Sequence, residues 1–567
     1  MKRYLYSAAL AAGMALLFTA CGRADLVLKG NVITMDPANP VAQAVAVKDG
    51  RVLLAGSLEQ VQAVSGRRTR VVDYGKASIY PGFMEGHAHG ALAAFRAAQA
   101  DLFPISGKAG ARMADYAEAM KRHIRENPGL PAYKGAGWIV CDCYPCAAML
   151  DAVCPDVPMY LNSADGHSMW LNSAAMKACG IDSAYADRMG HNCVRVDADG
   201  NPTGFMSETA AIAVLKHINP SFEESRNGLL KWQEYAFAHG ITATTEAALN
   251  LCGPNVIKAY ETLQKEGKWK LRTYAVQVID ESVPDEKLDS ALESVLNLHL
   301  TQRGEYFKVT GVKVFMDGVV EAHTAWLDDG YTDNPSDFGL HRCTDTARIA
   351  RIVSYANSHD MNVHFHAIGD GAVRTAVEGI VAGQKAAGVS EPRNAVAHLQ
   401  VVHPQDIVRM GQNHIIAVVA PLWVPTASPI YDYECKYIGE RAKTQYPIKS
   451  FTDEGCVINF HSDYPISPVL SMPYSIYGAV ERALMELGEG SRHNYPEHIT
   501  RLQALEAVTT GVAYQWKEED RLGSLSEGKI ANMVVYDTDF LNDTLAAVDA
   551  ASLLATYIDG EVVYQNK

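Results

Sequence analysis

The 567-residue sequence has no long run of Lys or Arg, no internal repeat and no low-complexity segment. Its formal net charge of -15 would repel nucleic acid and anionic lipid surfaces, so neither is expected as a partner. The apolar stretch 8–18 is too short to span a bilayer as a mature helix. The chain exceeds what one ordinary core supports, which favours one large domain with appended modules.

The first twenty residues have the pattern of a secretory signal. Lys2 and Arg3 precede the apolar stretch, and the segment 17–21 (LFTAC) resembles a bacterial lipobox, with Phe18 in place of the usual Leu. We expect residues 1–20 to be a lipoprotein signal peptide. The chain would then be exported to the bacterial cell envelope, facing the periplasm or the cell surface, and its only membrane contact would be a lipid anchor on Cys21. The alternative is a plain secretory signal with an incidental Cys21.

Eleven cysteines are too few for a disulfide scaffold in a chain of this length, and most are expected to be buried apolar residues. Four of them lie close together in the sequence: Cys141, Cys143, Cys146 and Cys154. Their spacing could converge on zinc, but no second pair of cysteines follows. In an oxidising compartment, a disulfide among them is favoured over a metal site.

Both ends of the chain are rich in short strands. Residues 44–48 lead through Asp49-Gly50 into 51–55, a hairpin signal, and two further strands are expected at 529–536 and 555–564. We therefore expect one small β-sandwich built from both termini. Its N-terminal part would be residues 21–80, and its C-terminal part, preceded by a helix, residues 501–567.

The middle of the chain, residues 81–500, alternates apolar strands with helical stretches, which predicts an α/β fold of the (β/α)8 or TIM-like barrel type. The eight candidate strands are 78–80 running into 86–89, then 241–245, 271–279, 307–316, 362–366, 394–400, 415–421 and 456–461. The stretch between the first two is too long for one crossover. We expect an inserted lid subdomain at about 95–235, covering the barrel mouth.

Residues able to bind a metal recur where these strands end. His87 and His89 are two residues apart, so an extended strand projects both imidazoles from one face. Lys313, His366, His398 and Asp463 occupy the ends of later strands. Because the strand ends of a barrel face one cavity, where this fold carries out its chemistry, these side chains are expected to converge.

The order His-x-His, Lys, His, His, Asp along the chain resembles that of the amidohydrolase superfamily. Pro81-Gly82-Phe83 and the closing segments 523–525 and 528–529 add to this resemblance. The resemblance is greatest to the branch that includes N-substituted formamide deformylase, and it covers nearly all of the mature chain. Segments 165–173, 203–208, 366–370 and 479–482 add to it. One departure is Glu85-Gly86, which stands where the family tends to have an Asp-containing dipeptide.

The resemblance implies a metal-dependent hydrolase that cleaves a non-peptide carbon–nitrogen bond, of amide or formamide type, in a small molecule. It implies two sets of metal ligands: His87, His89 and Asp463 for one ion, and His366 and His398 for the other. Lys313, as a carbamate, would bridge two zinc ions. Asp463 would also act as general base toward a metal-activated water and then protonate the leaving nitrogen.

Other polar residues near the strand ends have less defined roles. His364 and His461 lie two residues before His366 and Asp463, one layer deeper, and are expected to pack or to hydrogen-bond a ligand rather than be one. The candidates for substrate contact, in or beside the insertion, are His167, Trp170 and Glu208. A hydrogen-bonded structural loop is the alternative for these three.

Two rival functions stay open. If Lys313 instead pairs with an acid such as Asp317, the site is mononuclear, as suits a deaminase of a ring amidine or a cyclic amidase of the same superfamily. The other rival is a non-catalytic ligand-binding lipoprotein, for which a lost ligand would be expected. The sequence leaves the substrate and homo-oligomer formation open.

Overall fold

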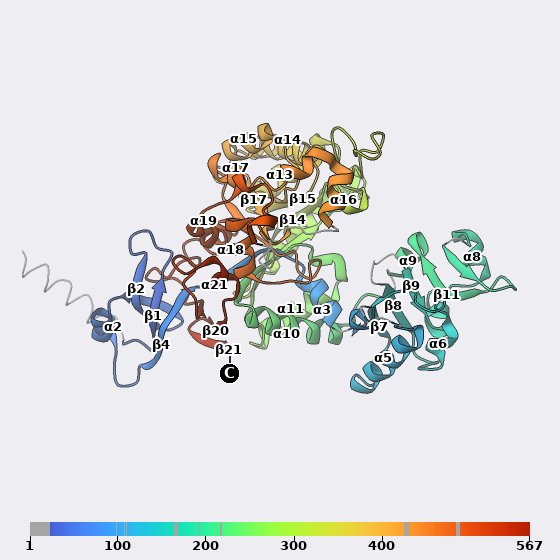
Figure 1. The fold of residues 1–567 in the computed structure, drawn as a ribbon, viewed down its shortest axis with the longest axis horizontal. Coiled ribbons are helices and arrows are strands. Elements are labelled where there is room, and N and C mark those ends of the chain that lie inside the picture. Colours follow the sequence, from blue (N-terminus) through green and yellow to red (C-terminus); the bar gives the residue numbers. More distant parts are fainter. Residues whose placement is uncertain are drawn as a thin grey trace, which may run out of the picture. The chain divides into compact units, whose positions relative to one another are not determined.

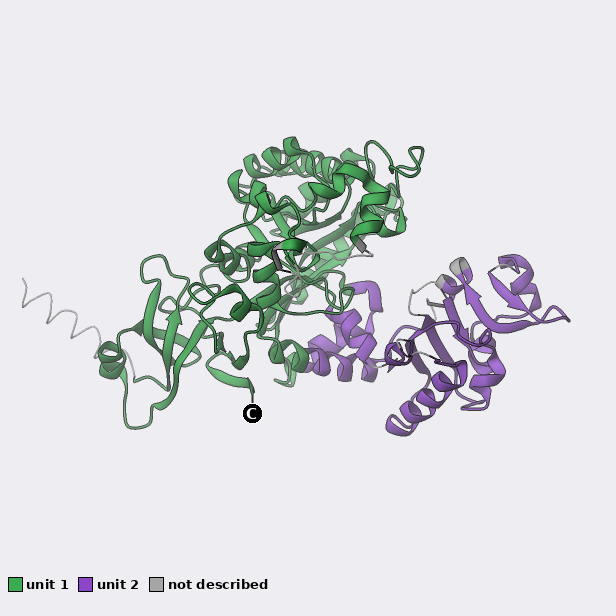
Figure 2. Ribbon diagram, viewed as in Figure 1, with its two compact units in different colours: residues 1–89, 233–249, 264–567 green, residues 90–232, 250–263 purple. Residues whose placement is uncertain are grey.

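A computed structural model describes residues 23–97, 99–106, 108, 110–163, 168–191, 193–215, 218–424, 430–483 and 488–566 (Figure 1). The predicted signal peptide and Cys21 lie outside these ranges. The chain divides into two compact units, coloured in Figure 2. Unit 1 comprises residues 1–89, 233–249 and 264–567, and unit 2 comprises residues 90–232 and 250–263. Over the described ranges, every helix is too short or too polar to cross a bilayer.

Strands from both ends of the chain form one seven-stranded sheet, in the order β21-β20-β19-β4-β1-β2-β3. Their bounds are β1 Leu26–Ile33, β2 Val41–Lys48, β3 Arg51–Gly56, β4 Arg70–Pro81, β19 Met533–Tyr536, β20 Leu553–Ile558 and β21 Glu561–Gln565. Residues from both termini, such as Leu28, Ile79 and Val535, share one buried core. This confirms the prediction that the termini build a common β domain, which takes the form of a single hydrogen-bonded sheet.

The hairpin between β2 and β3 has the two-residue turn that the sequence predicts. Asp49 and Gly50 have φ angles of 49° and 75°. Two successive positive φ angles define the type I′ turn, whose twist matches that of the flanking strands. The Asp49 N–H donates to Asp25 Oδ2 at 2.9 Å, which fixes the turn against β1.

Eight parallel strands form the barrel of unit 1, in the order β18-β17-β16-β15-β14-β13-β12-β5. Their bounds are β5 Phe83–Ala88, β12 Ile241–Glu246, β13 Arg272–Val278, β14 Phe307–Phe315, β15 Asn362–Ala367, β16 Ala395–His398, β17 Ile416–Val419 and β18 Ile458–Phe460. A Cβ on Gly86 would lie 2.8 Å from the Phe460 carbonyl oxygen, so glycine allows the first and last strands to approach closely. The predicted barrel is confirmed.

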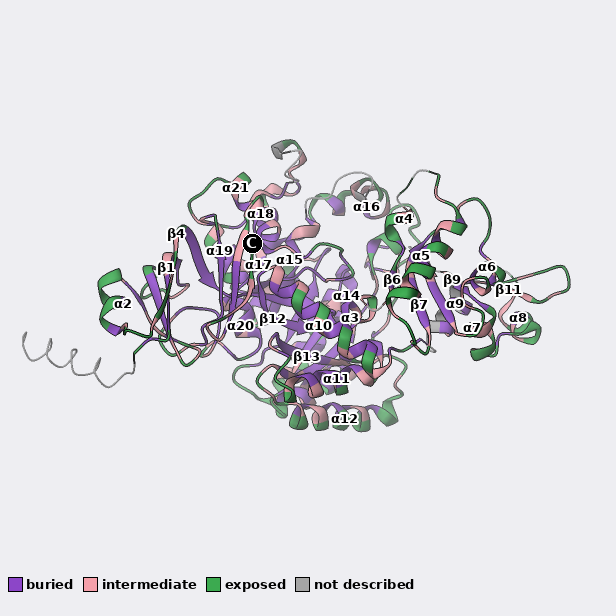
Figure 3. Cartoon of the chain, turned by 90° about the horizontal axis from the view of Figure 1, so that it is seen from below, coloured by how far each residue is buried: buried purple, intermediate pink, exposed green. Residues whose placement is uncertain are grey.

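Helices cover the outside of the barrel, and Figure 3 shows buried strands within a shell of partly exposed helices. The helices of unit 1 are α2 Leu58–Val64, α12 Leu288–Thr301, α13 Thr346–Ser358, α14 Asp370–Ala387, α15 Pro404–Gln412, α16 Ile430–Ile438, α17 Ile448–Asp453, α18 Met472–Glu481, α19 Arg501–Ala507, α20 Thr510–Gln515 and α21 Leu545–Asp549. Asp345 caps α13 by accepting from the Ala347 N–H at 2.8 Å. A Cβ on Gly383 would lie 2.5 Å from Val353 Cβ, so glycine permits the close packing of α14 on α13.

Unit 2 contains most of the stretch 95–235, where the sequence predicts an insertion, and also includes residues 90–94 and 250–263. It has its own six-stranded sheet, in the order β10-β11-β9-β8-β7-β6. The strands are β6 Ala100–Asp101, β7 Tyr133–Trp138, β8 Met159–Ser163, β9 Ser168–Leu171, β10 Val194–Val196 and β11 Pro202–Ser207. The helices are α3 Gly90–Ala97, α4 Phe103–Ser106, α5 Met113–Glu126, α6 Ala147–Asp151, α7 Ser173–Ala178, α8 Ser183–Met189 and α9 Glu208–Leu215, with α10 Phe222–Ala238 and α11 Asn255–Lys265 spanning its boundaries. Its role as a lid stays a prediction.

The four clustered cysteines of unit 2 are free thiols, so the disulfide expected among them is not formed in this structure. The Cys141 thiol lies 3.3 Å from the Ile139 carbonyl oxygen, and the Cys143 thiol lies 3.8 Å from Asp142 Oδ1. Both thiols therefore have local partners.

The first barrel strand begins later than the sequence predicted. Residues 78–80 belong to β4 of the terminal sheet, where Ile79 and Tyr80 pair with β19. The chain leaves that sheet at Gly82, whose N–H donates to the Asn532 carbonyl at 2.8 Å, and β5 begins at Phe83. A Cβ at Gly82 would lie 2.3 Å from Thr242 Oγ1, so the glycine allows the chain to pass from one sheet to the other.

Candidate metal centre

The carboxyl ends of five barrel strands, β5, β14, β15, β16 and β18, supply the residues that the sequence singled out. His87 lies near the end of β5 and His89 just after it, Lys313 lies in β14, His366 in β15, and His398 ends β16. Asp463 follows β18. Five of these side chains are buried, and His366 is 12% exposed. The barrel thus collects imidazoles, an amine and a carboxylate at one end, as the sequence predicted.

Asp463 lies between the two histidines of the first strand. Its Oδ1 is 3.2 Å from His87 Nε2 and 3.1 Å from His89 Nε2. The residue has a left-handed backbone, with φ at 59°, and its N–H donates to the His87 carbonyl at 3.2 Å. Burial raises the pKa of the Asp463 carboxyl, but the His89 contact and neighbouring positive charge outweigh burial and hold that pKa below its usual value. Asp463 is therefore ionised at neutral pH.

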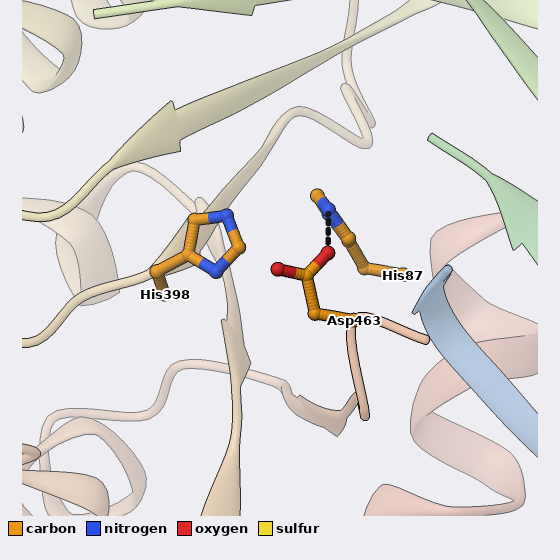
Figure 4. Close-up of side chains that lie close together, drawn as sticks. All are labelled: His87, His398 and Asp463. Atoms are coloured by element: carbon orange, nitrogen blue, oxygen red, sulfur yellow. Dashed lines mark ion pairs between the residues drawn. The ribbon is translucent and has the colours of Figure 1, made fainter. Parts of the chain in front are cut away.

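His398, at the end of β16, lies close to this group as well. Ligand atoms of His87, His398 and Asp463 all lie within 4.8 Å of one another, and Figure 4 shows the three side chains facing a common point. The sequence had placed His398 in the second ligand set, with His366. The structure brings His398 near both, since its ring centroid is 4.5 Å from that of His366 and 4.9 Å from that of His87.

His366 is held by backbone and carboxylate oxygens of the loop after β14. Its Nε2 lies 3.0 Å from the Gly318 carbonyl oxygen and 3.4 Å from Asp317 Oδ1. Asp317 accepts hydrogen bonds from the backbone N–H groups of Trp326, Ile368 and Gly369, at 2.8–3.0 Å for the shortest contact to each. Asp317 thus organises this loop instead of pairing with Lys313.

Lys313 is fully buried, and its Nζ makes no hydrogen bond within the described ranges. Its Nζ lies 4.9 Å from the centroid of the Phe315 ring. Burial lowers the pKa of Lys313 to about 7, although the nearby Asp463 charge acts to raise it. A substantial fraction of this amine is therefore neutral near pH 7.

The centre fits a divalent metal because several buried polar atoms lack a hydrogen-bond partner. In the part of the chain that the structure describes, these atoms are His87 Nε2, His89 Nδ1, His398 Nδ1, Lys313 Nζ, both ring nitrogens of His461, and Asp463 Oδ1. The His87–Asp463 contact has an ion-pair distance without hydrogen-bond geometry. Buried polar groups are nearly always paired, and imidazole nitrogens with a carboxylate oxygen are ligands that zinc prefers.

Burial also sets the protonation state of the imidazoles. It lowers the pKa of His87, His364 and His398 well below the usual value, and that of His366 to about 3. A neutral imidazole offers a free nitrogen lone pair, which metal binding requires.

His364 packs against the first strand, as the sequence predicted for a supporting residue. Its Nε2 lies 2.7 Å from His87 Nδ1. If His87 binds a metal through Nε2, its Nδ1 carries the proton and donates to His364 Nε2. His364 therefore fixes the tautomer and orientation of His87.

The sequence does not indicate the role of Glu85, which stands out there only as a departure from the family pattern. The Glu85 carboxyl accepts from the Ser462 N–H at 2.9 Å and from the Ser462 hydroxyl at 2.7 Å, and lies 3.3 Å from the His87 N–H. Burial raises the pKa of Glu85 to about 8. Glu85 thus connects the first strand to the segment that carries Asp463. Its position two residues before His87 was the available signal.

The three predicted substrate contacts belong to unit 2. His167 lies outside the described residues, as does the side chain of Glu208, whose backbone begins α9. Trp170 is fully buried in the core of unit 2, and its indole N–H donates to the Cys146 carbonyl at 2.8 Å. Trp170 therefore packs the insertion, and substrate contact by these residues stays a prediction.

A parallel eight-stranded barrel with imidazoles and a carboxylate at the carboxyl ends of its strands is typical of barrel hydrolases that use divalent metals. The model of the Amidohydrolase family matches residues 70–564, so the chain belongs to this family, as the sequence motifs indicated.

Several known proteins are similar over almost the whole chain. The protein LONG AFTER FAR-RED 3 of Arabidopsis thaliana is 28% identical over 95% of this chain and 91% of its own length. The N-substituted formamide deformylase of Arthrobacter pascens is 24% identical over 95% of this chain and 98% of its own. An uncharacterized metal-dependent hydrolase from Pyrococcus horikoshii shares the fold, with a TM-score of 0.73, 22% identity, and coverage of 92% of this chain and 99% of its own.

Proposed function

We propose that the protein is a metal-dependent hydrolase that cleaves a non-peptide carbon–nitrogen bond, of amide or formamide type, in a small molecule. The observation that carries this proposal is a group of buried imidazole, amine and carboxylate atoms at the carboxyl end of the barrel, for which the described residues provide no hydrogen-bond partner. The similarity to an N-substituted formamide deformylase supports the type of bond.

The residues divide into two ligand sets in this proposal, with His87, His89 and Asp463 on one side and His366 and His398 on the other. Lys313 lies in β14, which pairs with β15, the strand that carries His366. Bound divalent metal supplies Lewis acidity, which lowers the pKa of water and polarises the scissile carbonyl. Zinc is the ion proposed, because it accepts imidazole and carboxylate ligands together.

Lys313 would bridge the two sets as a carbamate. Its neutral amine nitrogen attacks the carbon of carbon dioxide, a nitrogen–carbon bond forms, and the nitrogen loses one proton to solvent. The product is an anion with two oxygen donors, where a protonated ammonium would repel a metal. The lowered pKa of Lys313 supports this step because only the neutral amine reacts.

Asp463 would act as general base and then as general acid. Its pKa is held below the usual value, so its carboxylate is ready to accept a proton from the attacking water. The same oxygen would then transfer that proton to the leaving nitrogen. The left-handed backbone of Asp463 and its hydrogen bond to the His87 carbonyl hold the carboxylate beside the histidines.

A mononuclear deaminase or cyclic amidase is the second candidate. The observation in its favour is the tight group of His87, His398 and Asp463, which would hold one ion without Lys313. Release of ammonia would identify a deaminase, and release of a carboxylate would identify an amide hydrolase. A non-catalytic ligand-binding lipoprotein ranks below both, because no proposed ligand is missing.

We also propose that the protein is exported and anchored to the membrane by a lipid on Cys21. The support is the order of the first 21 residues, in which basic residues precede an apolar stretch and small residues precede Cys21.

The function is tested by screening N-formyl, N-acyl and cyclic amide compounds with the metal-loaded mature protein, using Asp463→Asn as the matched control. Metal-dependent release of formate or another carboxylate by the wild-type protein, and not by the variant, is the expected result. If the metal-loaded protein hydrolyses no compound of these classes, the proposed reaction is wrong.

A further inference from the structure

His461 is a buried imidazole that the two ligand sets do not use. It follows β18, is 0% exposed, and neither of its ring nitrogens has a hydrogen-bond partner in the described part of the structure. The sequence suggested that it would hydrogen-bond a ligand residue, and the described residues give no such bond. Buried polar side chains are nearly always paired, so the partner of His461 is expected to be something other than the described residues.

The ring of His461 completes a nearly equilateral triangle of imidazoles. The centroid distances are 4.9 Å for His87–His398, 5.1 Å for His87–His461 and 5.0 Å for His398–His461. Two imidazoles on one tetrahedral zinc ion, each with a Zn–N bond of about 2.0 Å, have centroids about 5 Å apart. All three spacings therefore suit imidazoles that share one ion.

Asp463 offers a fourth donor beside this triangle. Its carboxylate lies within 4.8 Å of ligand atoms of His87 and His398, and the group that these atoms form does not include His461 in its present ring orientation. His461 precedes Asp463 by two residues, on the same strand end. The χ2 torsion of histidine is broad, so rotation of the His461 ring can turn either nitrogen toward the others.

Trp423 closes the other side of this group. Its ring stacks on His398 with a centroid distance of 5.4 Å and meets His461 edge to face, also at 5.4 Å. The Trp423 indole N–H donates to the Ser467 hydroxyl at 2.6 Å, so it is not available to His461. The aromatic ring therefore shields His461 from water on that side without giving it a polar partner.

We propose that His461 is a metal ligand, and that it binds one divalent ion together with His87, His398 and Asp463. The inference rests on the proposed function, which supplies the metal. It changes the ligand sets in two ways: it moves His398 from the set with His366 to the ion of His87 and Asp463, with which it is grouped, and it adds His461. His364 differs from His461 because its Nε2 already has a partner, His87 Nδ1. His364 is a positioning residue, and His461 binds the ion itself.

The test is titration of the metal-free mature protein with Co²⁺, followed by visible and near-ultraviolet absorption and by metal analysis. The variants are His461→Gln and His461→Cys, with His364→Gln and His364→Cys as matched controls in the same buried layer. Circular dichroism reports folding. His461→Cys keeps a metal donor, and it decides the question if His461→Gln does not fold.

We expect His461→Gln to weaken Co²⁺ binding by more than about 100-fold and to change the cobalt spectrum, whereas His364→Gln weakens it by about 10–100-fold, as removal of an outer partner does. His461→Cys should add a thiolate-to-cobalt charge-transfer band that His364→Cys lacks, because only a bound sulfur gives this band.

A His461→Gln protein with the wild-type cobalt spectrum and affinity would overturn the proposal. Bound cobalt without a thiolate band in His461→Cys would overturn it as well. Failure of the proposed reaction is distinguishable, because the metal-loaded wild-type protein would then hydrolyse no compound of the screened classes, whereas the cobalt affinity and spectrum would still report whether His461 binds the ion. A wild-type protein that binds no Co²⁺ would overturn both proposals.

Discussion

Replacement of Glu85 by Gln tests how the first and last barrel strands are held together. The Glu85 carboxyl is fully buried and accepts two hydrogen bonds from Ser462, at 2.7 Å and 2.9 Å. Gln keeps one oxygen acceptor and the same shape, and its amide can donate to the Ser462 hydroxyl. The variant should fold, and its main difference is that position 85 no longer ionises.

The magnitude follows from the pKa of Glu85, which burial raises from 4.5 to about 8. Below pH 4.5 the carboxyl is protonated in both the folded and the unfolded chain, so it imposes no penalty. Between pH 4.5 and about 8 only the unfolded chain loses the proton, so the wild-type protein loses stability as pH rises. The loss is about 1.4 kcal/mol per pH unit, or about 2.7 kcal/mol between pH 5 and pH 7.

Urea unfolding of the metal-free protein at pH 5, 6 and 7 measures this effect. The free energy of unfolding of Glu85→Gln should rise relative to wild type by about 2.7 kcal/mol over this range, because the variant lacks the ionisation penalty. Glu85→Ala should be less stable than both at every pH, because it leaves the Ser462 N–H and hydroxyl buried without a partner. Parallel pH dependences of wild type and Glu85→Gln would show that burial does not raise the pKa of Glu85.

Three further predictions concern the anchor, the general base and the metal. Cys21→Ala should release the protein from the membrane fraction or block its maturation, and unchanged fractionation and processing would contradict the lipid anchor. Asp463→Asn should lower the hydrolysis rate by about 10²–10⁴-fold while retaining part of the metal affinity, measured by steady-state kinetics and metal analysis. Chelation should lower the thermal midpoint, since an ion at 1,000 times its Kd stabilises the folded state by about 4 kcal/mol; an unchanged midpoint after complete metal removal would count against a bound metal.

The sequence predicted those elements that a short stretch of residues, or a regular pattern along the chain, specifies without reference to distant contacts. The Asp49-Gly50 turn has a distinctive dipeptide, and the alternation of apolar strands with helices is the pattern of a parallel barrel. The convergence of His87 and His398 follows from this topology, because all strand ends of a barrel meet at one end. These features needed no knowledge of individual contacts.

The contacts that depend on packing across the barrel could not be predicted. Glu85 binds Ser462, almost four hundred residues later in the chain, and the pairing of His364 with His87 likewise joins distant strands. The start of the first strand was misplaced because β4 and β5 are separated by Gly82 alone, and both flanking segments have strand character.

The packing inside unit 2 could not be predicted from the sequence either. Trp170 is an aromatic residue of a kind that often contacts substrates. Its burial depends on the sheet and helices of unit 2, which the sequence around it does not reveal. Apolar residues of such a core come from several strands, so the sequence around Trp170 does not distinguish a core residue from a contact residue.

The most direct test of a metal centre built around Lys313 is the metal content of the wild-type protein and of Lys313→Ala, measured together with hydrolysis. We expect about two divalent ions per wild-type chain, falling to about one or fewer in the variant, with hydrolysis abolished. A wild-type content of one ion per chain, with Lys313→Ala retaining that ion and most of the activity, would contradict the binuclear centre and favour the mononuclear candidate.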